Sequence, residues 1–129
     1  MQTHMNGFGD DPLFVTSTDG RIASIYSNSV WKGNEKVLEE LRKEDPDAAD
    51  GIEFMANHYG ADAKIDPQGR VMLPTDLRRG LALENQEVRL LCSYGVIQVY
   101  SNAEYEARVR QHNQGLVTSL KTAKLKGFK

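Results

Sequence analysis

Residues 66–79 read DPQGRVMLPTDLRR, and this stretch predicts a tight hairpin followed by a short helix. Residues 66–69 fit a β-turn, with proline at the second position and glycine at the fourth. Before the turn, residues 63–65 alternate apolar and charged side chains, which is typical of a strand, and residues 71–73 resume the sheet. Pro74 ends the second strand because it has no backbone N–H to donate.

A short helix is predicted after this proline, with Thr75 as its N-cap and Gly80 at its end. The helix carries two adjacent arginines, Arg78 and Arg79, which a helix of this length does not need in order to fold. The turn residues are thus explained by structure alone. The arginines indicate either ordinary surface charge or contact with an anionic partner.

The chain also contains a weak internal repeat, and repeats bear directly on architecture. Residues 19–31 (DGRIASIYSNSVW) and 94–105 (YGVIQVYSNAEY) both run from a glycine turn through an alternating strand to Tyr-Ser-Asn and an aromatic residue. Each copy predicts a strand, a turn, a second strand and a helix. The alignment pairs Tyr26 with Tyr100, Ser27 with Ser101, Asn28 with Asn102 and Trp31 with Tyr105.

Three longer helices are predicted around these copies. The first extends from a cap within residues 27–29 to about residue 43. A connecting helix, capped by Asp47 or Asp50 and ended by Gly60, is expected to pack between two lobes. In the second copy, Ser101 is followed by a glutamate at the spacing of a capping box.

The composition is that of an ordinary globular chain of 129 residues, with 40% apolar and 26% charged residues. The net charge of −2 is divided unevenly, since residues 1–60 balance at −6 and residues 61–129 at +4. Basic residues gather toward the final KTAKLKGFK. Residues 114–129 are expected to form a solvated, frayed basic tail, with a phosphate-binding arm as the alternative.

Several classes of function find no support in the sequence. The single cysteine, Cys92, lies in the apolar run VRLLC and is expected in the core, where it offers neither a disulfide nor a metal site. No secretory leader or apolar run of membrane length is recognised, which predicts a cytoplasmic protein without a membrane partner. Paired carboxylates, an activated nucleophile and a glycine-rich phosphate loop are not found, so no catalytic residue, metal, cofactor or small-molecule substrate is expected.

One ordered set of motifs resembles a known family. The pattern Asp-x-x-Gly-Arg, three residues, proline and a short helix with Leu-Arg resembles the MraZ family of bacterial transcription regulators, whose fold is the swapped-hairpin AbrB barrel. Members join tandem repeats by a helix of the IEFMANHYGAD type, and each repeat has a hairpin that ends in an aromatic residue before a helix opening with Trp or Tyr. The resemblance covers residues 13 to about 112.

The resemblance implies an α+β fold of tandem swapped-hairpin AbrB-like β-barrel repeats with connecting helices. It divides the chain into a flexible N-terminus (1–12), an incomplete first repeat with its connecting helix (13–60), a complete second repeat (61–113) and the basic tail (114–129). The first repeat is expected to be incomplete because residues 1–12 contain no Asp-x-x-Gly-Arg. Its missing hairpin would leave the strand around Phe14 without its usual partner.

The resemblance also implies a function. A regulator of this kind binds double-stranded DNA at repeated promoter elements upstream of the division and cell-wall gene cluster, as a homo-oligomer such as a ring, at the nucleoid. Several copies are needed because one loop with a few phosphate contacts binds weakly. The alternative is a non-catalytic assembly or interaction subunit, either a truncated MraZ-like chain or an antitoxin-like AbrB barrel, with weak DNA binding or none.

The candidate DNA contacts surround the Asp-x-x-Gly-Arg loop. Arg70 matches the arginine that the family's loop presents to DNA, and it is expected to donate in a fork to guanine or phosphate. Asp66 is expected to anchor the turn by accepting backbone N–H bonds or to hold Arg70 in place. The other interpretation is an internal ion pair between these two residues beside ordinary surface charges. The remaining candidates are Gln68 in the turn and the phosphate-positioning Lys64, Arg78 and Arg79.

Overall fold

The protein is an α+β chain in a computed structural model that describes residues 12–68 and 70–129, and this confirms the expected class. The N-terminal segment expected to be flexible lies outside the described residues up to residue 11, as does Gly69 of the predicted turn. The elements in chain order are β1 (Leu13–Thr16), β2 (Ala23–Ser27), α2 (Asn28–Glu44), α3 (Pro46–Tyr59), β3 (Ala61–Ala63), α4 (Thr75–Gly80), β4 (Val88–Ser93), β5 (Val96–Ser101), α5 (Asn102–Gln114) and α6 (Leu116–Leu125).

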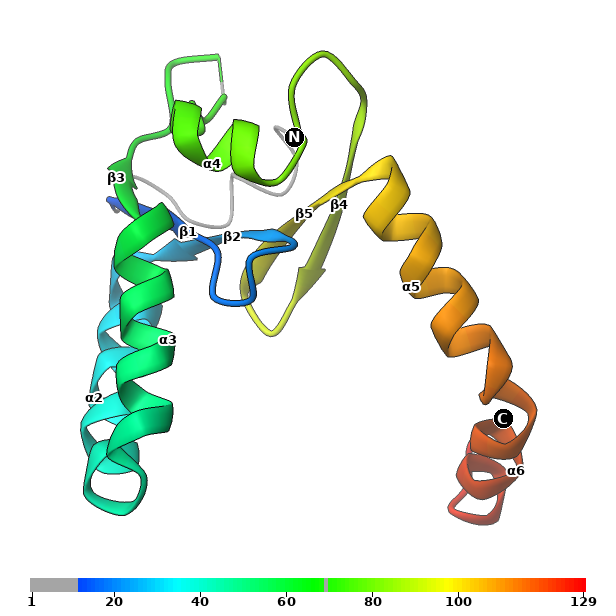
Figure 1. Ribbon diagram of the computed structural model, residues 1–129. Coiled ribbons are helices and arrows are strands. Elements are labelled where there is room, and N and C mark those ends of the chain that lie inside the picture. Colours follow the sequence, from blue (N-terminus) through cyan, green and yellow to red (C-terminus); the bar gives the residue numbers. More distant parts are fainter. Residues whose placement is uncertain (1–11, 69) are drawn as a thin grey trace.

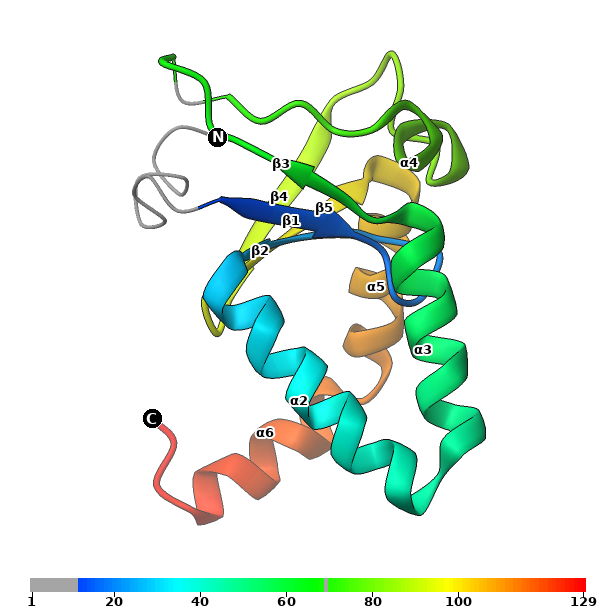
Figure 2. The same cartoon turned by 90° about the vertical axis from the view of Figure 1, so that its left-hand side faces the viewer.

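Five strands form a single antiparallel sheet in the order β3-β1-β2-β5-β4. Figure 1 shows α4 over one side of the sheet, whereas α2 with α3 and α5 with α6 extend from the other side at opposite ends. Figure 2 shows α3 running beside α2 and leading back to β3. The predicted connecting helix is therefore present, but it packs on α2 at the flank of the sheet and not between two lobes.

The core lies between the sheet and α4. Alternate residues of β1, β2 and β5 face it, as expected for a sheet that is covered on this side. The helix α4 contributes one fully buried side chain, Leu77, and the chain that follows adds two leucines. The arginines of α4 are thereby left on the outside. The buried members of the core are Leu13, Val15, Ala23, Ile25, Val71, Leu77, Leu81, Leu83, Ile97 and Val99.

The two copies of the predicted repeat are related by an approximate two-fold axis in the sheet. β2 and β5 pair antiparallel about Ser24 and Gln98, which each precede the shared Tyr-Ser-Asn by two residues. Ser27 and Ser101 cap α2 and α5 with nearly the same backbone angles, φ −66° and ψ 153° against φ −65° and ψ 158°. Each copy packs an aromatic pair beside its cap, Tyr26 with Trp31 (centroids 5.0 Å apart) and Tyr100 with Tyr105 (5.9 Å).

The start of α3 differs from the sequence prediction. Its N-cap is Asp45, whose side chain accepts the Ala48 N–H at 3.1 Å, and not Asp47 or Asp50. Pro46 then takes the first helical position, where its missing N–H would have no intrahelical partner in any case. Pro46 therefore belongs to the beginning of α3.

Cys92 is exposed, so the prediction that it lies in the core is wrong. β4 is an edge strand that pairs with β5 alone among the described strands, and Cys92 lies at its exposed end, next to its last residue. The strand around Phe14 was expected to lack its usual partner; in the structure, β1 is bordered by β2 on one side and β3 on the other. Among the described residues, the longer open edge therefore belongs to the second copy.

The C-terminal region is helical, so the expected frayed tail is wrong as well. The helix α6 follows α5 after Gly115, and its end is closed by a Phe128 N–H that donates to the Ala123 carbonyl at 3.0 Å. Several of its apolar side chains are exposed, including Val117 and Leu125. Within residues 12–68 and 70–129, no helix has both the length and the apolar character required to cross a bilayer.

We expect Gly60→Ala to destabilise the protein by about 1–3 kcal/mol, the usual cost of overpacking. A Cβ at Gly60 would overlap the carbonyl oxygen of Ala56 and the ring of Phe14, so the junction of α3 and β3 would have to shift. Gly33→Ala is the matched control, because a Cβ there meets no atom within 4 Å. Thermal unfolding followed by circular dichroism compares the two, and an unchanged stability of Gly60→Ala would show that the junction tolerates a methyl group.

Candidate nucleic-acid interface

The loop predicted to contact DNA folds around the carboxylate of Asp66. Its Oδ1 accepts the backbone N–H of Gln68 at 2.9 Å and that of Arg70 at 2.8 Å. The Asp66 N–H donates to the Arg70 carbonyl at 2.8 Å and closes the loop. One short side chain thus satisfies the turn's own backbone, which is the anchoring role predicted for Asp66.

Arg70 is displayed at the surface while two neighbours hold its guanidinium. Its Nε donates to Asp66 Oδ2 at 3.0 Å, and its Nη2 donates to Gln68 Oε1 at 2.9 Å. The Arg70 side chain is nevertheless 71% exposed. The internal ion pair between Arg70 and Asp66 therefore forms. It leaves the guanidinium accessible to an anion, as DNA binding requires.

We expect the Asp66 carboxyl to titrate below 3.8, the ordinary value for aspartate, because its pKa is lowered in the fold. The backbone N–H of Arg70 lowers this pKa most, and the Arg70 guanidinium and the Gln68 N–H lower it further against a desolvation that raises it. A lowered carboxyl pKa stabilises the fold above the unfolded value, and that stabilisation is lost as the pH falls through the folded pKa. The loop should keep its geometry from neutral pH down to about 4. A carbon-13 NMR titration of this carboxyl measures the midpoint, and a midpoint above 3.8 would contradict the anchoring role.

The two arginines of α4 have partners of their own. Arg78 Nη2 donates to Thr75 Oγ1 at 3.1 Å, and its Nε is buried without a hydrogen-bond partner among the described residues. Arg79 Nε lies 3.6 Å from Glu84 Oε1, and the Arg79 side chain is 72% exposed. Thr75 does not cap α4 as predicted, because the N-cap position belongs to Pro74 and makes no side-chain bond. Its hydroxyl orients Arg78 instead.

The structure brings three of the six predicted contacts together and separates the others. Figure 1 shows the segment between β3 and α4 rising beside α4 on the same side of the sheet. Lys64 is exposed between β3 and the loop. Both helical arginines lie beyond Pro74. The hydrogen-bonded unit consists of Asp66, Gln68 and Arg70.

Sequence reasoning missed one feature of this surface. The strand expected over residues 71–73 is reduced to a single bridge between Ile65 and Val71. Met72, which follows the bridge, is 77% exposed. The signal was present in the sequence, since a proline two residues after Met72 leaves no room for a longer ladder.

A second charged cluster lies away from the loop and ties the two copies together. Asp19 accepts the backbone N–H groups of Arg21 at 2.9 Å and Ile22 at 3.1 Å, and Arg108 Nη2 donates to its Oδ2 at 3.2 Å. Arg108 also pairs with Glu104 at 3.2 Å. Burial raises the pKa of Asp19, but these hydrogen bonds outweigh it and lower the pKa overall. In the part of the chain that the structure describes, no three His, Cys, Asp or Glu side chains are grouped to hold a metal ion.

The fold and the loop define a class of protein: an α+β chain whose antiparallel sheet joins two related hairpins and displays a carboxylate-anchored charged turn. A family model described as "MraZ protein, putative antitoxin-like" matches residues 60–126, just over half of the chain. The chain belongs to the MraZ family. The match includes the loop, α4 and the second hairpin, and it extends into α6, beyond the end of the resemblance noted in the sequence.

Curated relatives carry the name "Transcriptional regulator MraZ". The protein from Acidobacterium capsulatum is 37% identical over 66 residues, which are 51% of this chain and 44% of that protein. The protein from Koribacter versatilis is 31% identical over 100 residues, or 76% of this chain and 65% of the relative. The protein from Thiobacillus denitrificans is 29% identical over 107 residues, or 83% and 70%. The chain spans about half the length of the first relatives it matches.

Proposed function

We propose that this chain is a sequence-specific DNA-binding transcriptional regulator of the MraZ type, without catalytic activity, in the cytoplasm and at the nucleoid. It binds repeated promoter elements upstream of the division and cell-wall gene cluster as a homo-oligomer. Residues 13–60 and 61–113 act in this proposal as tandem AbrB-like swapped-hairpin repeats. The observation that carries the proposal is the Asp66-anchored loop, which displays an Arg70 side chain that is 71% exposed. The relatives' printed names support the regulatory role.

Arg70 is the base-reading residue in this proposal. A guanidinium matches the O6 and N7 acceptors of guanine, or two phosphate oxygens, with a fork of parallel donors. Because Asp66 and Gln68 already hold the guanidinium, less side-chain entropy is lost when DNA binds. The exposed Lys64 and Arg79 position phosphates on either side of the loop.

A single copy carries too little positive charge at this surface to bind tightly. Residues 61–87 contain four basic and five acidic side chains, so the loop and α4 attract DNA weakly on charge alone. Affinities of ~10⁻⁴–10⁻⁶ M are typical of non-specific binding at physiological salt. Several loops on one oligomer raise the apparent affinity ~10²–10⁴-fold when the DNA repeats match their spacing. The proposal therefore requires more than one copy on each operator.

Fluorescence anisotropy tests this function directly. The full chain is titrated with DNA from upstream of its own gene and with a shuffled control, each at two salt concentrations. We expect a preference for the upstream DNA and weaker binding at the higher salt concentration. Equal or absent binding to both DNAs would favour the second candidate, an assembly or interaction subunit, which the "antitoxin-like" wording of the family description supports.

Replacing Lys64 by alanine should weaken binding to both DNAs alike and reduce the salt slope by about one. The side chain is exposed beside the loop, where an ammonium contacts phosphate without reading sequence. Lys126→Ala, at the end of α6, is the matched control. An equal loss in both variants would assign the basic C-terminal region to the interface as well.

A further inference from the structure

The hydrogen bonds of the Asp66 loop occupy one side of the Arg70 guanidinium and leave its far end accessible. The Nε atom donates to Asp66 Oδ2 at 3.0 Å, and Nη2 donates to Gln68 Oε1 at 2.9 Å. Within the residues that the structure describes, Arg70 makes no hydrogen bond through Nη1. Both hydrogens of Nη1 and one hydrogen of Nη2 therefore remain to donate to a partner. These donors lie at the end of a side chain that is 71% exposed.

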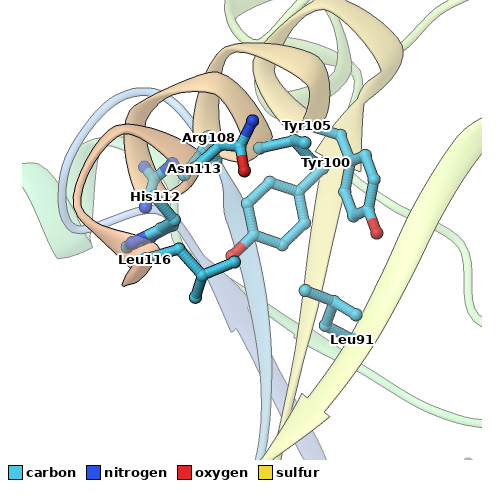
Figure 3. Close-up of a pocket in the computed structure, with 8 residues that line it drawn as sticks. Leu91, Tyr100, Tyr105, Arg108, His112, Asn113 and Leu116 are labelled. Atoms are coloured by element: carbon cyan, nitrogen blue, oxygen red, sulfur yellow. The ribbon is translucent and has the colours of Figure 1, made fainter. Parts of the chain in front are cut away.

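The same two nitrogen atoms of Arg108 are held in a different way. Its Nε donates to Glu104 Oε1 and its Nη2 to Asp19 Oδ2, each at 3.2 Å. Its Cζ lies 5.6 Å from the centroid of the Tyr100 ring, and Figure 3 shows both side chains at the cavity that β4, β5 and α5 line. The Arg108 side chain is 31% exposed. One guanidinium with two carboxylates has a net negative charge, which suits a structural contact and not a DNA contact.

Around Arg70, the second acceptor is a neutral amide in place of a carboxylate. The guanidinium and the Asp66 carboxylate balance each other's charge, and Gln68 adds none. A second carboxylate would give the loop a net negative charge, which repels phosphate and the electron-rich edge of a base alike. The carboxamide therefore holds the guanidinium without reducing its attraction to DNA.

Two hydrogen bonds also define the plane of the guanidinium, which one bond does not. With Asp66 as its sole acceptor, the planar group would turn about that bond, and the carboxamide of Gln68 stops this rotation. A base edge accepts a pair of parallel donors when the guanidinium lies in the plane of the base pair. A phosphate contact carries no sequence information and tolerates other orientations. An acceptor that fixes the plane thus favours base recognition over phosphate contact.

We propose that Gln68 determines the sequence preference of the loop through Arg70, by holding the guanidinium so that its remaining Nη1 and Nη2 donors meet guanine O6 and N7. This inference rests on the proposed function, because it takes Arg70 as the base-reading residue. Gln68 is a positioning residue in this arrangement. Its backbone N–H also supports the loop, since it donates to Asp66 Oδ1 at 2.9 Å. A substitution of the side chain leaves that backbone bond in place, so the two roles are separable.

The orientation of the guanidinium is tested first in the full chain without DNA. Nitrogen-15 NMR at low temperature follows the rotation of the Arg70 guanidinium about its Nε–Cζ bond, which hydrogen bonds to Nε and Nη2 slow down. We expect separate Nη1 and Nη2 signals in the unaltered chain and merged signals in Gln68→Leu, whose side chain has no acceptor. Equal rotation in the two chains would overturn the positioning role. Circular dichroism compares their folds.

Fluorescence anisotropy then measures the preference for the upstream DNA over the shuffled DNA. Gln68→Leu should reduce this preference about three- to tenfold, which corresponds to one hydrogen bond that orients the reading group. Gln68→Glu keeps an oxygen acceptor, so it should retain the preference while its negative charge weakens binding to both DNAs. Gln114→Leu is the matched control, because Gln114 is exposed at the end of α5. Its preference should equal that of the unaltered chain.

Combining the substitutions shows whether Gln68 acts through Arg70. In the Arg70→Ala chain, Gln68→Leu should cause no further loss of preference, because the group that it orients is gone. A further loss there would mean that the Gln68 side chain contacts DNA itself, and the positioning role would be wrong. An unchanged preference in Gln68→Leu would also overturn it, as would a preference lost in Gln68→Glu. If the unaltered chain shows no preference, the proposed function fails, and the NMR comparison alone decides whether Gln68 holds Arg70.

Discussion

Replacing Arg70 by alanine is expected to weaken binding to the upstream DNA about 5- to 150-fold while the fold persists. This range corresponds to the ~1–3 kcal/mol of a bidentate base contact. The fold should survive because the Arg70 side chain is 71% exposed and its hydrogen bonds are made within the loop. Binding to shuffled DNA should change less, since only one phosphate-attracting charge is lost. Anisotropy titrations on both DNAs measure the ratio.

Two further variants distinguish base recognition by Arg70 from non-specific attraction between positive charge and phosphate. Arg79→Ala removes an equally exposed guanidinium from α4 and should weaken binding to both DNAs to a similar extent. Asp66→Asn retains an oxygen acceptor for the two loop amides but loses the charge that holds Arg70 Nε. Its affinity for the upstream DNA should fall between those of the unaltered chain and Arg70→Ala. If Arg70→Ala unfolds or keeps full preference for the upstream DNA, the loop is structural and not the reading element.

Leu77→Ala is expected to have the largest effect on stability, about 2–5 kcal/mol of the free energy of unfolding. Leu77 is the buried residue of α4, it is 0% exposed, and it packs in the core beside Leu81 and Leu83. The helix has six residues and no side-chain cap, so it depends on this contact. Urea unfolding followed by circular dichroism measures the loss.

The matched control is Leu125→Ala, because Leu125 is 90% exposed at the end of α6. A surface substitution of this kind usually changes stability by less than about 0.5 kcal/mol. A comparable loss in both variants would show that α4 is not held by its leucine. Under conditions where Leu77→Ala remains folded, its DNA binding reports whether the position of α4 matters for the loop.

The features that the sequence predicted correctly depend on hydrogen bonds between residues only a few positions apart in the chain. Ser27 and Ser101 cap their helices through N–H groups three residues ahead, and Asp66 anchors its turn through residues two and four positions on. Such side-chain to backbone bonds form wherever the chain bends locally, so the pattern alone indicates them. The candidate loop could therefore be built almost completely from its sequence. Whether it touches DNA stays a prediction.

Several of the wrong predictions concern relations between distant segments. The apolar run around Cys92 has the composition of an interior strand, and only the sheet order shows that β4 has one neighbour among the described strands. The strand around Phe14 was expected to lack its usual partner, and the sequence did not indicate that β3, which follows two helices later in the chain, pairs with it. The N-cap of α3 is a local exception, because Asp47 or Asp50 was predicted but Asp45 caps the helix and Pro46 follows it at the first helical position. Local pattern does not encode which strand lies next to which.

The pairing of β2 with β5 has a consequence for the order of events during synthesis. Ala23 meets Val99 in the middle of the sheet, so the contact that joins the two hairpins has a long sequence separation. Chains that depend on such contacts fold slowly, because a large loop must close before the strands can pair. While the chain is being translated, the first hairpin leaves the ribosome before its central neighbour has been made. Until then, the edge of β2 that pairs with β5 in the finished fold is open to non-native pairing.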